Sequence, residues 1–256
     1  MDLPAQIAHW LASAQRAVAF SGAGLSTESG LPDFRSPGGI WATSQPVYYQ
    51  DFLGSAAARW EYWRQKSIAH RDFLLCSPNI AHRTLAQWES QGRLCGVITQ
   101  NIDEYHTEAG SQNVVELHGT ARKIKCLDCE TLFDANALVT EFLQTNQVPS
   151  CAHCGGFLKH ATISFGQSLD ATVLAKAVKL SQEADLYFVL GSSLVVHPAA
   201  SLPQLAQRAG AKLIIINRDV TPLDNIADVV LHESLGETLS KIDAALADIT
   251  KANQAG

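Results

Sequence analysis

The chain has 256 residues, of which 46% are hydrophobic, enough to bury the core of one α/β domain and a small second module. A formal net charge of −6 and an isoelectric point near 5.8 give no basic field for nucleic-acid phosphates. The longest apolar runs are too short to cross a bilayer, and the N-terminus lacks a signal-peptide pattern. We therefore expect a cytoplasmic protein without nucleic-acid or membrane partners, and we take it to be a monomer.

Six short, continuously apolar runs predict strands that are buried on both faces, as in a parallel sheet. In chain order they are residues 17–20, 96–99, 114–117, 186–190, 213–216 and 229–231. Helical patterns lie between them, at residues 56–68, 81–91, 170–183 and 198–209. This alternation predicts an α/β fold, a Rossmann-like parallel sheet with helices on both faces.

Two stretches break the alternation of strands and helices. Residues 28–50 are rich in Gly, Pro and Ser and predict a long loop, a kind of segment that is usually functional or disordered. Residues 123–159 lose the parallel-sheet pattern and contain two pairs of cysteines. We therefore expect residues 123–159 to form a small inserted module, with residues 1–122 and 160–250 forming the main domain.

The cysteine pairs are Cys126-x-x-Cys129 and Cys151-x-x-Cys154, separated by 21 residues. Each pair turns two thiolates toward one point, and four thiolates satisfy a tetrahedral zinc ion without leaving an open position. The pattern predicts a small zinc-ribbon module whose metal is structural, although the separation is slightly longer than the roughly 15–20 residues typical of such sites. A redox-active Cys-x-x-Cys is the alternative.

A glycine-rich turn, Gly22-Ala23-Gly24, directly follows the first predicted strand. In that position glycines let the backbone approach a phosphate, and free amides at the next helix start face its charge. Thr27 stands where the third glycine of a dinucleotide fingerprint belongs, and no acidic residue follows a clear second strand about twenty residues later. Taken alone, the motif could equally be an ordinary strand-to-helix turn.

Polar residues also follow the other predicted strands. Gln100-Asn101-Ile102-Asp103 ends the second strand, and His118 ends the third. Ligands of open α/β sheets bind beyond the carboxyl ends of the strands, so these side chains are candidates for a binding site. An imidazole that titrates near neutrality suits a general base, whereas a lone histidine is more often structural and an Asn-x-Asp turn is common.

Together these segments resemble the signatures of the sirtuin family, in the order that family shows. The run at 21–35, which includes Asp33-Phe34-Arg35, resembles the first signature, and residues 99–103 and His118 resemble the next two. Later signatures are matched at 191–194, 217–219 and 221–224. The resemblance extends over about residues 3 to 245.

This resemblance implies an NAD-dependent protein-lysine deacylase that releases nicotinamide, O-acyl-ADP-ribose and free lysine from acylated proteins. It implies that His118 is the catalytic base, assisted by Asn101 and Asp103. Ile163, Phe165 and Gly166 are implied at the substrate. The residues implied at NAD are Gly22, Ala23, Gly24, Thr27, Phe34, Arg35, Gln100, Asn101, Ile102, Asp103, His118, Gly191, Ser192, Ser193, Asn217 and Arg218. Parts of residues 28–75 would form the cofactor loop and a small helical module.

The acyl group and the type of reaction leave alternatives. Family members that prefer succinyl or malonyl groups place Tyr and Arg three residues apart on the helix after the cofactor loop, where this chain has Trp63 and Lys66. We therefore favour acetyl or a longer neutral acyl group, although Lys66 offers a point charge. Mono-ADP-ribosyl transfer or NAD hydrolysis, and a non-catalytic NAD-sensing module, are the alternative functions; a sensor would not need His118.

Overall fold

The computed structural model describes residues 2–34, 37–40 and 44–254. Its larger sheet has six parallel strands in the order β3-β2-β1-β7-β8-β9. Their bounds are β1 (Ala17–Ser21), β2 (Gly96–Thr99), β3 (Val114–Glu116), β7 (Leu186–Leu190), β8 (Lys212–Ile216) and β9 (Val229–Leu231). All six strands were predicted, because strands buried on both faces contain a run of apolar residues, here bounded by polar ends such as Ser21 and Thr99.

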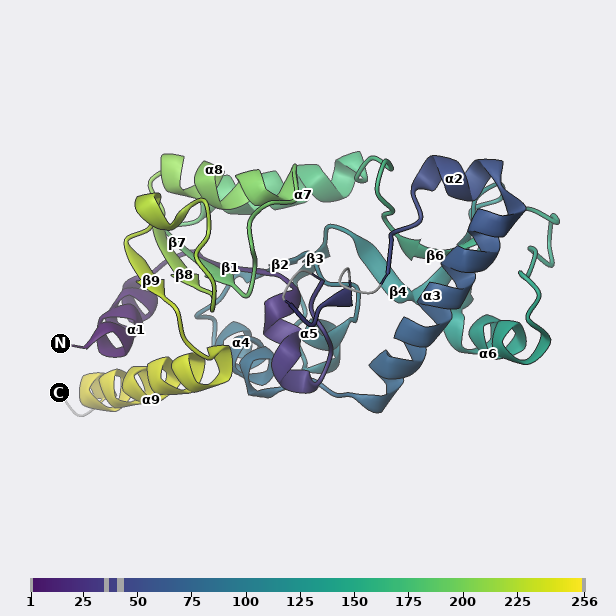
Figure 1. The fold of residues 1–256 in the computed structure, drawn as a ribbon. Coiled ribbons are helices and arrows are strands. Elements are labelled where there is room, and N and C mark those ends of the chain that lie inside the picture. The colour runs from purple at the N-terminus through teal and green to yellow at the C-terminus, as the bar shows by residue number, and fades with distance from the viewer. Residues whose placement is uncertain (1, 35–36, 41–43, 255–256) are drawn as a thin grey trace.

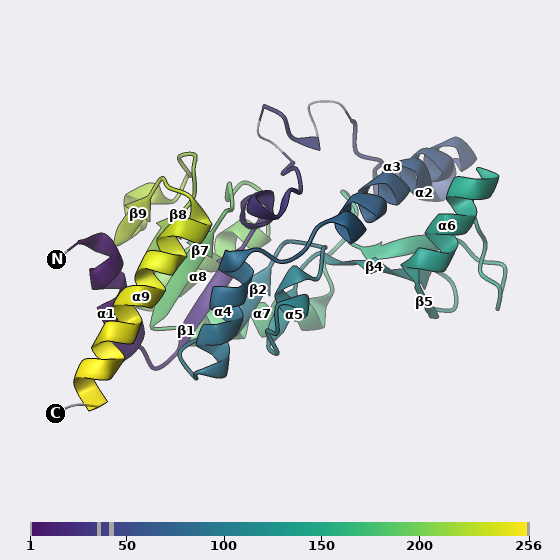
Figure 2. The same cartoon turned by 90° about the horizontal axis from the view of Figure 1, so that it is seen from below.

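Helices cover both faces of this sheet, as Figures 1 and 2 show, which confirms the predicted fold class. On one face lie α1 (Leu3–Ser13), α4 (Ile80–Ser90) and α9 (Leu235–Gln254), and on the other α7 (Ala171–Glu183) and α8 (Leu202–Arg208). Leu11, Trp88 and Ile242 enter the core of the first face, whereas Ala177 and Leu202 enter the second. The sheet is therefore shielded on both sides, and ligands reach it at the strand ends.

The predicted helices at 81–91 and 170–183 are found within one residue, as α4 and α7, and the other two differ more. The helix predicted at 56–68 is α3 (Ala56–Leu75), which continues to Leu75. The helix predicted at 198–209 is divided into the short 3₁₀ helix η3 (Ala199–Ser201) and α8, and residue 198 precedes the helical turn instead of opening it.

A second, antiparallel sheet has the strand order β5-β4-β6. It comprises β4 (Gly119–Cys126), β5 (Leu132–Asp134) and β6 (Leu158–Thr162), and it packs with α2 (Tyr49–Gly54), α3 and α6 (Ala135–Thr145). Phe52, Trp63, Ile124, Phe142 and Leu158 form their shared core. This sheet extends a few residues beyond the predicted module at 123–159 on both sides.

The molecule is elongated, with the smaller sheet and its helices at one end (Figures 1 and 2). Both termini lie at the opposite end, where α1 packs against α9. Three short helices complete the described elements: η1 (Ala23–Ser29), α5 (Tyr105–Glu108) and η4 (Asp224–Ile226). Within the described part of the chain, no helix has the length and apolar character that a bilayer span requires.

Candidate active site

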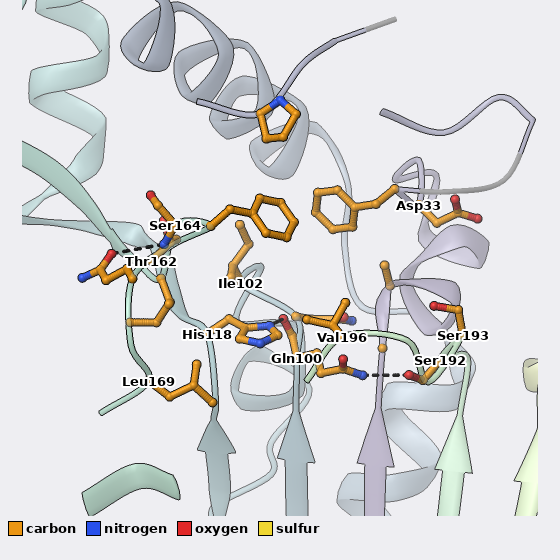
Figure 3. A pocket seen from close by; sticks show the side chains of 18 of the residues that line it. Asp33, Gln100, Ile102, His118, Thr162, Ser164, Leu169, Ser192, Ser193 and Val196 are labelled. Atoms are coloured by element: carbon orange, nitrogen blue, oxygen red, sulfur yellow. Dashed lines mark hydrogen bonds between the residues drawn. The ribbon is translucent and has the colours of Figure 1, made fainter. Parts of the chain in front are cut away.

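A cavity of about 420 Å³ lies at the carboxyl ends of β1, β2, β7 and β8, facing the smaller sheet. The strand order reverses between β1 and β7, which is the topological switch point where open α/β sheets bind ligands. Figure 3 shows Ser192 and Ser193 on one side of this cavity, Thr162 and Ser164 on the other, and His118 between them. The cavity is therefore shared by the two sheets.

Two strand-end turns touch at the base of the cavity. The Gly24 N–H donates to the Gly191 carbonyl at 2.9 Å, and the Gly22 N–H donates to the Leu190 carbonyl at 3.0 Å. A Cβ on Gly22 would lie 2.7 Å from the Gly191 oxygen, and a Cβ on Gly191 would lie 2.3 Å from the Leu25 nitrogen. Glycine is thus needed for the contact between the two turns, and Gly191 also has a left-handed backbone with φ +62°.

The short helix η1 that follows the first turn is held from two directions. The Asn79 side-chain amide donates to the Leu25 carbonyl at 2.8 Å. The Glu28 carboxylate accepts from the backbone N–H groups of Leu235 and Gly236, both at 3.0 Å, at the start of α9. A carboxylate at a helix N-terminus pairs with otherwise unsatisfied amides and is favoured by the helix dipole. This pairing fixes η1 relative to the core.

Asn101 and Asp103, at the end of β2, are joined through Ser26 of η1. The Asn101 amide donates to Ser26 Oγ at 3.1 Å, and Ser26 Oγ donates to Asp103 Oδ2 at 2.7 Å. The other Asp103 oxygen accepts the Tyr105 N–H at 3.0 Å. Burial raises the pKa of Asp103, while the hydrogen bonds from Tyr105 and Ser26 and the charge of Arg122 oppose that rise. Asn101 and Asp103 are therefore buried and fixed in orientation.

Gln100 bridges the two halves of the larger sheet. Its side-chain amide donates to Ser192 Oγ, after β7, at 2.8 Å (Figure 3). Both side chains line the cavity. The end of β2 is thus connected across β1 to the end of β7.

His118 lies in the cavity between β3 and β4 (Figure 3). Its Nδ1 lies 2.9 Å from the Gln100 carbonyl oxygen, which can only accept a hydrogen bond, so a neutral imidazole carries its proton on Nδ1. Nε2 is then the basic nitrogen. The next residue, Gly119, has φ +68°, and a Cβ there would lie 2.0 Å from the Ala161 oxygen. The sharp turn that places His118 therefore requires glycine.

The opposite wall comes from the segment after β6 and from α3. Ile163, Phe165 and Gly166 line this side of the cavity. The backbone of the segment is fixed to neighbouring elements, since the Ile163 N–H donates to the His118 carbonyl and the Tyr49 N–H to the Phe165 carbonyl, both at 2.9 Å. The three predicted substrate residues thus lie in the same cavity as the predicted base.

A second cavity of about 270 Å³ adjoins the first. Ala23, Phe34, Asn101 and Ile102 line both cavities, whereas Asp103 lines only the second. The shared wall is therefore made by residues of the first two predicted motifs together with Gln65 of α3.

Most predicted NAD residues line the first cavity: Gly22, Ala23, Gly24, Phe34, Gln100, Asn101, Ile102, His118, Gly191, Ser192, Ser193 and Asn217. Thr27 lines neither of these two cavities, and its hydroxyl donates to the Gly24 carbonyl at 2.9 Å. Arg218 is exposed and does not line them either. Arg35 lies outside the described residues.

Several lining residues were not predicted, among them Tyr62, Thr162, Leu169 and Val196. They come from α3, from β6 and from loops without a recognisable motif, so their spacing along the chain carried no signal. Lys66 was noted in the sequence, and the structure places it in the cavity wall.

The four paired cysteines meet in the smaller module, where all four Sγ atoms lie within 4.8 Å of one another. Cys126 Sγ lies 3.5 Å from Cys154 Sγ, and Cys129 Sγ lies 3.7 Å from Cys151 Sγ. Tetrahedral zinc with Zn–S bonds of roughly 2.3 Å requires sulfur separations of about 3.8 Å. The sulfur set therefore fits a zinc ion with four protein ligands.

Comparison with known proteins identifies relatives along nearly the whole chain. The model of the Sir2 family matches residues 22–198. An NAD-dependent protein deacetylase from Rhodopseudomonas palustris is 43% identical over 236 residues, which span 91% of this chain and 93% of that protein. The sequence similarity thus covers both sheets and the cavity between them.

Solved structures of Sir2 enzymes are also similar to this chain over nearly its whole length. A Sir2 enzyme with a p53 peptide and NAD⁺ has a TM-score of 0.86 at 35% identity. A Sir2 variant with deacetylated p53 peptide and 3′-O-acetyl ADP ribose has a TM-score of 0.88 at 36% identity. Each comparison covers 93% of this chain and 96% of the other.

Proposed function

The chain belongs to the Sir2 family and is an NAD-dependent protein-lysine deacylase, and we propose which of its own residues carry out that reaction. The observation that carries the proposal is the position of His118. Its Nδ1 is bonded to the Gln100 carbonyl, and it lies in one cavity with both the strand-end turns and the segment after β6. A base placed between a cofactor wall and a substrate wall suits a reaction that joins the two ligands.

NAD⁺ fits the strand-end side of the cavity, because the residues there are those that bind phosphates and riboses. The turns at Gly22–Gly24 and Gly191–Ser193 leave room for a phosphate at their glycines and offer the Ser192 and Ser193 hydroxyls. Asn217 offers a side-chain amide at the end of β8. When bound, NAD⁺ supplies a ribosyl carbon from which nicotinamide can leave. Roles at NAD⁺ for Thr27, Arg35 and Arg218 stay predictions.

His118 is the proposed general base, and Nε2 is the atom that accepts the proton. The Gln100 carbonyl holds the proton on Nδ1, so a basic lone pair remains on Nε2. Removing a proton from a substrate hydroxyl turns that hydroxyl into a nucleophile. The carbonyl also stabilises the imidazolium that then forms, because it accepts a shorter, charge-assisted hydrogen bond.

Asn101 and Asp103 are proposed to orient the bound cofactor. Ser26 links their side chains, so both enter the wall of the second cavity with fixed orientation. Phe34 and Ile102 line both cavities and exclude water from the boundary between them.

The acylated lysine is proposed to enter along the segment after β6. Ile163 and Phe165 provide apolar side chains for the lysine stem, and Gly166 leaves its backbone accessible. Recognition through the backbone as an added strand suits an enzyme that acts on many sequences. The zinc ion, held by Cys126, Cys129, Cys151 and Cys154, would fold the module that carries this segment and take no part in the reaction.

We also propose a cytoplasmic monomer without nucleic-acid partners. The net charge of −6 supports the last point, because an acidic chain is repelled by phosphate backbones. A division into residues 1–122 with 160–250 and an inserted 123–159 is proposed on the change of hydrophobic pattern.

The purified protein, incubated with NAD⁺ and acyl-lysine peptides, tests the proposed function when nicotinamide and peptide mass are followed together. Equal amounts of nicotinamide and deacylated peptide are expected. Nicotinamide without deacylation would indicate ADP-ribosyl transfer or NAD hydrolysis. Absence of both products, with NAD⁺ still bound, would indicate a sensing module.

A further inference from the structure

The loop that follows β8, residues 217–224, is joined at both ends by one side chain, His232, which comes directly after β9. His232 Nδ1 lies 2.8 Å from the Asn217 carbonyl oxygen, and Nε2 lies 3.4 Å from a carboxylate oxygen of Asp224, where η4 begins. Because a carbonyl can only accept a hydrogen bond, Nδ1 carries the proton in the first contact. The imidazole therefore connects the first residue of this loop with the last.

Both partners of His232 are held by further hydrogen bonds. The other carboxylate oxygen of Asp224 accepts from the hydroxyl of Thr221, a buried residue of the same loop. The Asn217 N–H donates to the Leu231 carbonyl at 3.1 Å. Leu231 and His232 thus bind the N–H and the C=O of the same residue, so the backbone of Asn217 is fixed on both sides.

Asn217 is the residue through which this arrangement reaches the first cavity. It lines that cavity together with Asp219, whereas His232 lines neither of the two cavities. The side-chain amide of Asn217 donates to the Asp219 carbonyl at 2.7 Å. Its side-chain oxygen can accept a hydrogen bond from a ligand hydroxyl. The orientation of Asn217 is therefore set by its own loop and, from behind the cavity wall, by His232.

The strand order indicates which part of NAD⁺ would reach Asn217. His118 follows β3, the two glycine turns follow β1 and β7, and Asn217 follows β8, so they lie in this order along one edge of the sheet. A cofactor with its reacting ribosyl carbon near His118 and its phosphates at the glycine turns would extend its adenosine toward Asn217. A ribose hydroxyl of that adenosine is then the group that the Asn217 side chain would meet.

We propose that His232 is a positioning residue for NAD⁺, which acts through Asn217 to shape the adenosine end of the cavity. Without the imidazole, the Asn217 carbonyl and the Asp224 carboxylate lose their common partner, and the loop between them is free to leave the shape that the ribose requires. Cofactor binding would weaken while the chemistry at His118 continues. This inference rests on the proposed function, because it requires NAD⁺ to occupy the strand-end wall.

The test compares His232→Leu, which removes both contacts, with His232→Asn, whose amide N–H can replace that of Nδ1. Calorimetry with ADP-ribose measures binding without turnover, and steady-state kinetics separates kcat from the KM values of NAD⁺ and acetyl-lysine peptide. In His232→Leu, the Kd of ADP-ribose and the KM of NAD⁺ should rise about threefold to tenfold, the effect of losing one ordinary hydrogen bond. His232→Asn should restore most of this affinity, and kcat and the peptide KM should stay unchanged in both variants.

His9→Leu, the same substitution at an exposed histidine of α1, is the matched control and should bind ADP-ribose as wild-type protein does. Because the His232 side chain is 40% exposed, His232→Leu is expected to fold. Unchanged affinity of His232→Leu for ADP-ribose, or equal loss of affinity in His232→Asn, would overturn the inference, as would a fall in kcat at constant KM for NAD⁺. Weakened ADP-ribose binding in His232→Leu, with no deacylation by wild-type protein, would retain it while contradicting the proposed function.

Discussion

The strand-end side and the α3–β6 side of the site differ in whether their polar side chains have hydrogen-bond partners. On the strand-end side, Ser26 and Asp103 line the adjoining second cavity and Asn101 lines both, and these three side chains are bonded to one another before any ligand binds. On the α3–β6 side, Lys66 lines the cavity and makes no hydrogen bond, and neither ring nitrogen of His160, which is buried behind this wall, has a hydrogen-bond partner within the described part of the chain. Buried polar groups without partners are destabilising, so the second wall gives up stability that the first retains.

The two walls are therefore suited to different kinds of ligand. A wall whose groups are already oriented suits a ligand of constant shape, because no reorganisation is needed when that ligand binds. A wall with unpartnered donors gains most from a ligand that supplies the missing acceptor. These properties agree with the proposed binding of NAD⁺ at the strand-end wall and of the acylated lysine at the opposite wall.

The largest effect is expected at His118, which lies between the walls. His118→Ala should lower kcat by about 10²–10⁴-fold, the usual contribution of a general base, while NAD⁺ still binds. Single-turnover kinetics and NAD⁺ binding measure the two properties, with His9→Ala, an exposed histidine of α1, as the control. Unchanged turnover in His118→Ala would contradict its assigned role.

Zinc removal should unfold the smaller sheet, which carries the substrate wall of the cavity, and leave the larger sheet folded. Structural zinc contributes on the order of 10 kcal/mol to the folding of small modules, so a strong chelator or Cys151→Ser should unfold the β4–β6 sheet and abolish deacylation. Hydrogen exchange should rise across residues 119–162 and stay low in β1 and β7. Cys95→Ser, away from the cysteine cluster, is the control. Deacylation that survives complete loss of zinc would show that the module folds without it.

Removing the Ser26 hydroxyl that bridges Asn101 and Asp103 should have a smaller effect on catalysis. Ser26→Ala leaves the Asn101 amide and one Asp103 oxygen without their shared partner, at a cost of about 1–3 kcal/mol. We expect the KM for NAD⁺ to rise by roughly tenfold to a hundredfold. Steady-state kinetics checks this, and Ser90→Ala, on the exposed side of α4, should leave KM unchanged. An unaltered KM in Ser26→Ala would mean that the wall does not depend on this bridge.

The smallest expected effect is on the pH dependence of folding stability, and it comes from Glu116 at the end of β3. Burial, followed by the charges of Glu104 and Asp103, raises the pKa of Glu116 from 4.5 to about 7. The folded state therefore binds this proton more tightly than the unfolded state, and stability falls as pH rises from about 4.5 to 7. Glu116→Gln should remove that decline and stabilise the protein by about 1–2 kcal/mol at pH 8, after allowance for its partial exposure. Urea unfolding at pH 5 and pH 8 measures the difference, and parallel curves for the two proteins would refute it.

The strands of the larger sheet could be predicted because each has an apolar interior, with polar residues such as Ser21, Thr99 and Glu116 only at the ends. The strands of the smaller sheet could not, since β6 buries the polar residues Lys159 and His160 and β4 alternates buried and exposed positions. Along β4, exposed Lys123 is followed by buried Ile124, a pattern too short to distinguish from a loop. The helix expected at 198–209 was placed too early, because a proline can precede a helical turn as well as open it.

Site residues were predictable where they follow strands, since the ends of parallel strands converge at one edge. Gln100 and His118 were found in this way and do meet, through an imidazole–carbonyl hydrogen bond. Tyr62 and Thr162 were not found, because their proximity depends on how α3 packs across β6. Such contacts between distant segments leave no periodicity in the sequence.

The two attachments of η1 have a mechanical consequence for the chain that follows. Leu25 is tied to α4 through Asn79, and Glu28 is tied to the start of α9. Gly30, with φ +96°, is the first residue after η1, and a side chain there would be strained. The N–H groups of Gly30 and Leu31 also donate back to the Thr27 and Ser26 carbonyls, so any displacement of the Phe34 segment has to begin beyond Leu31 while η1 stays in place.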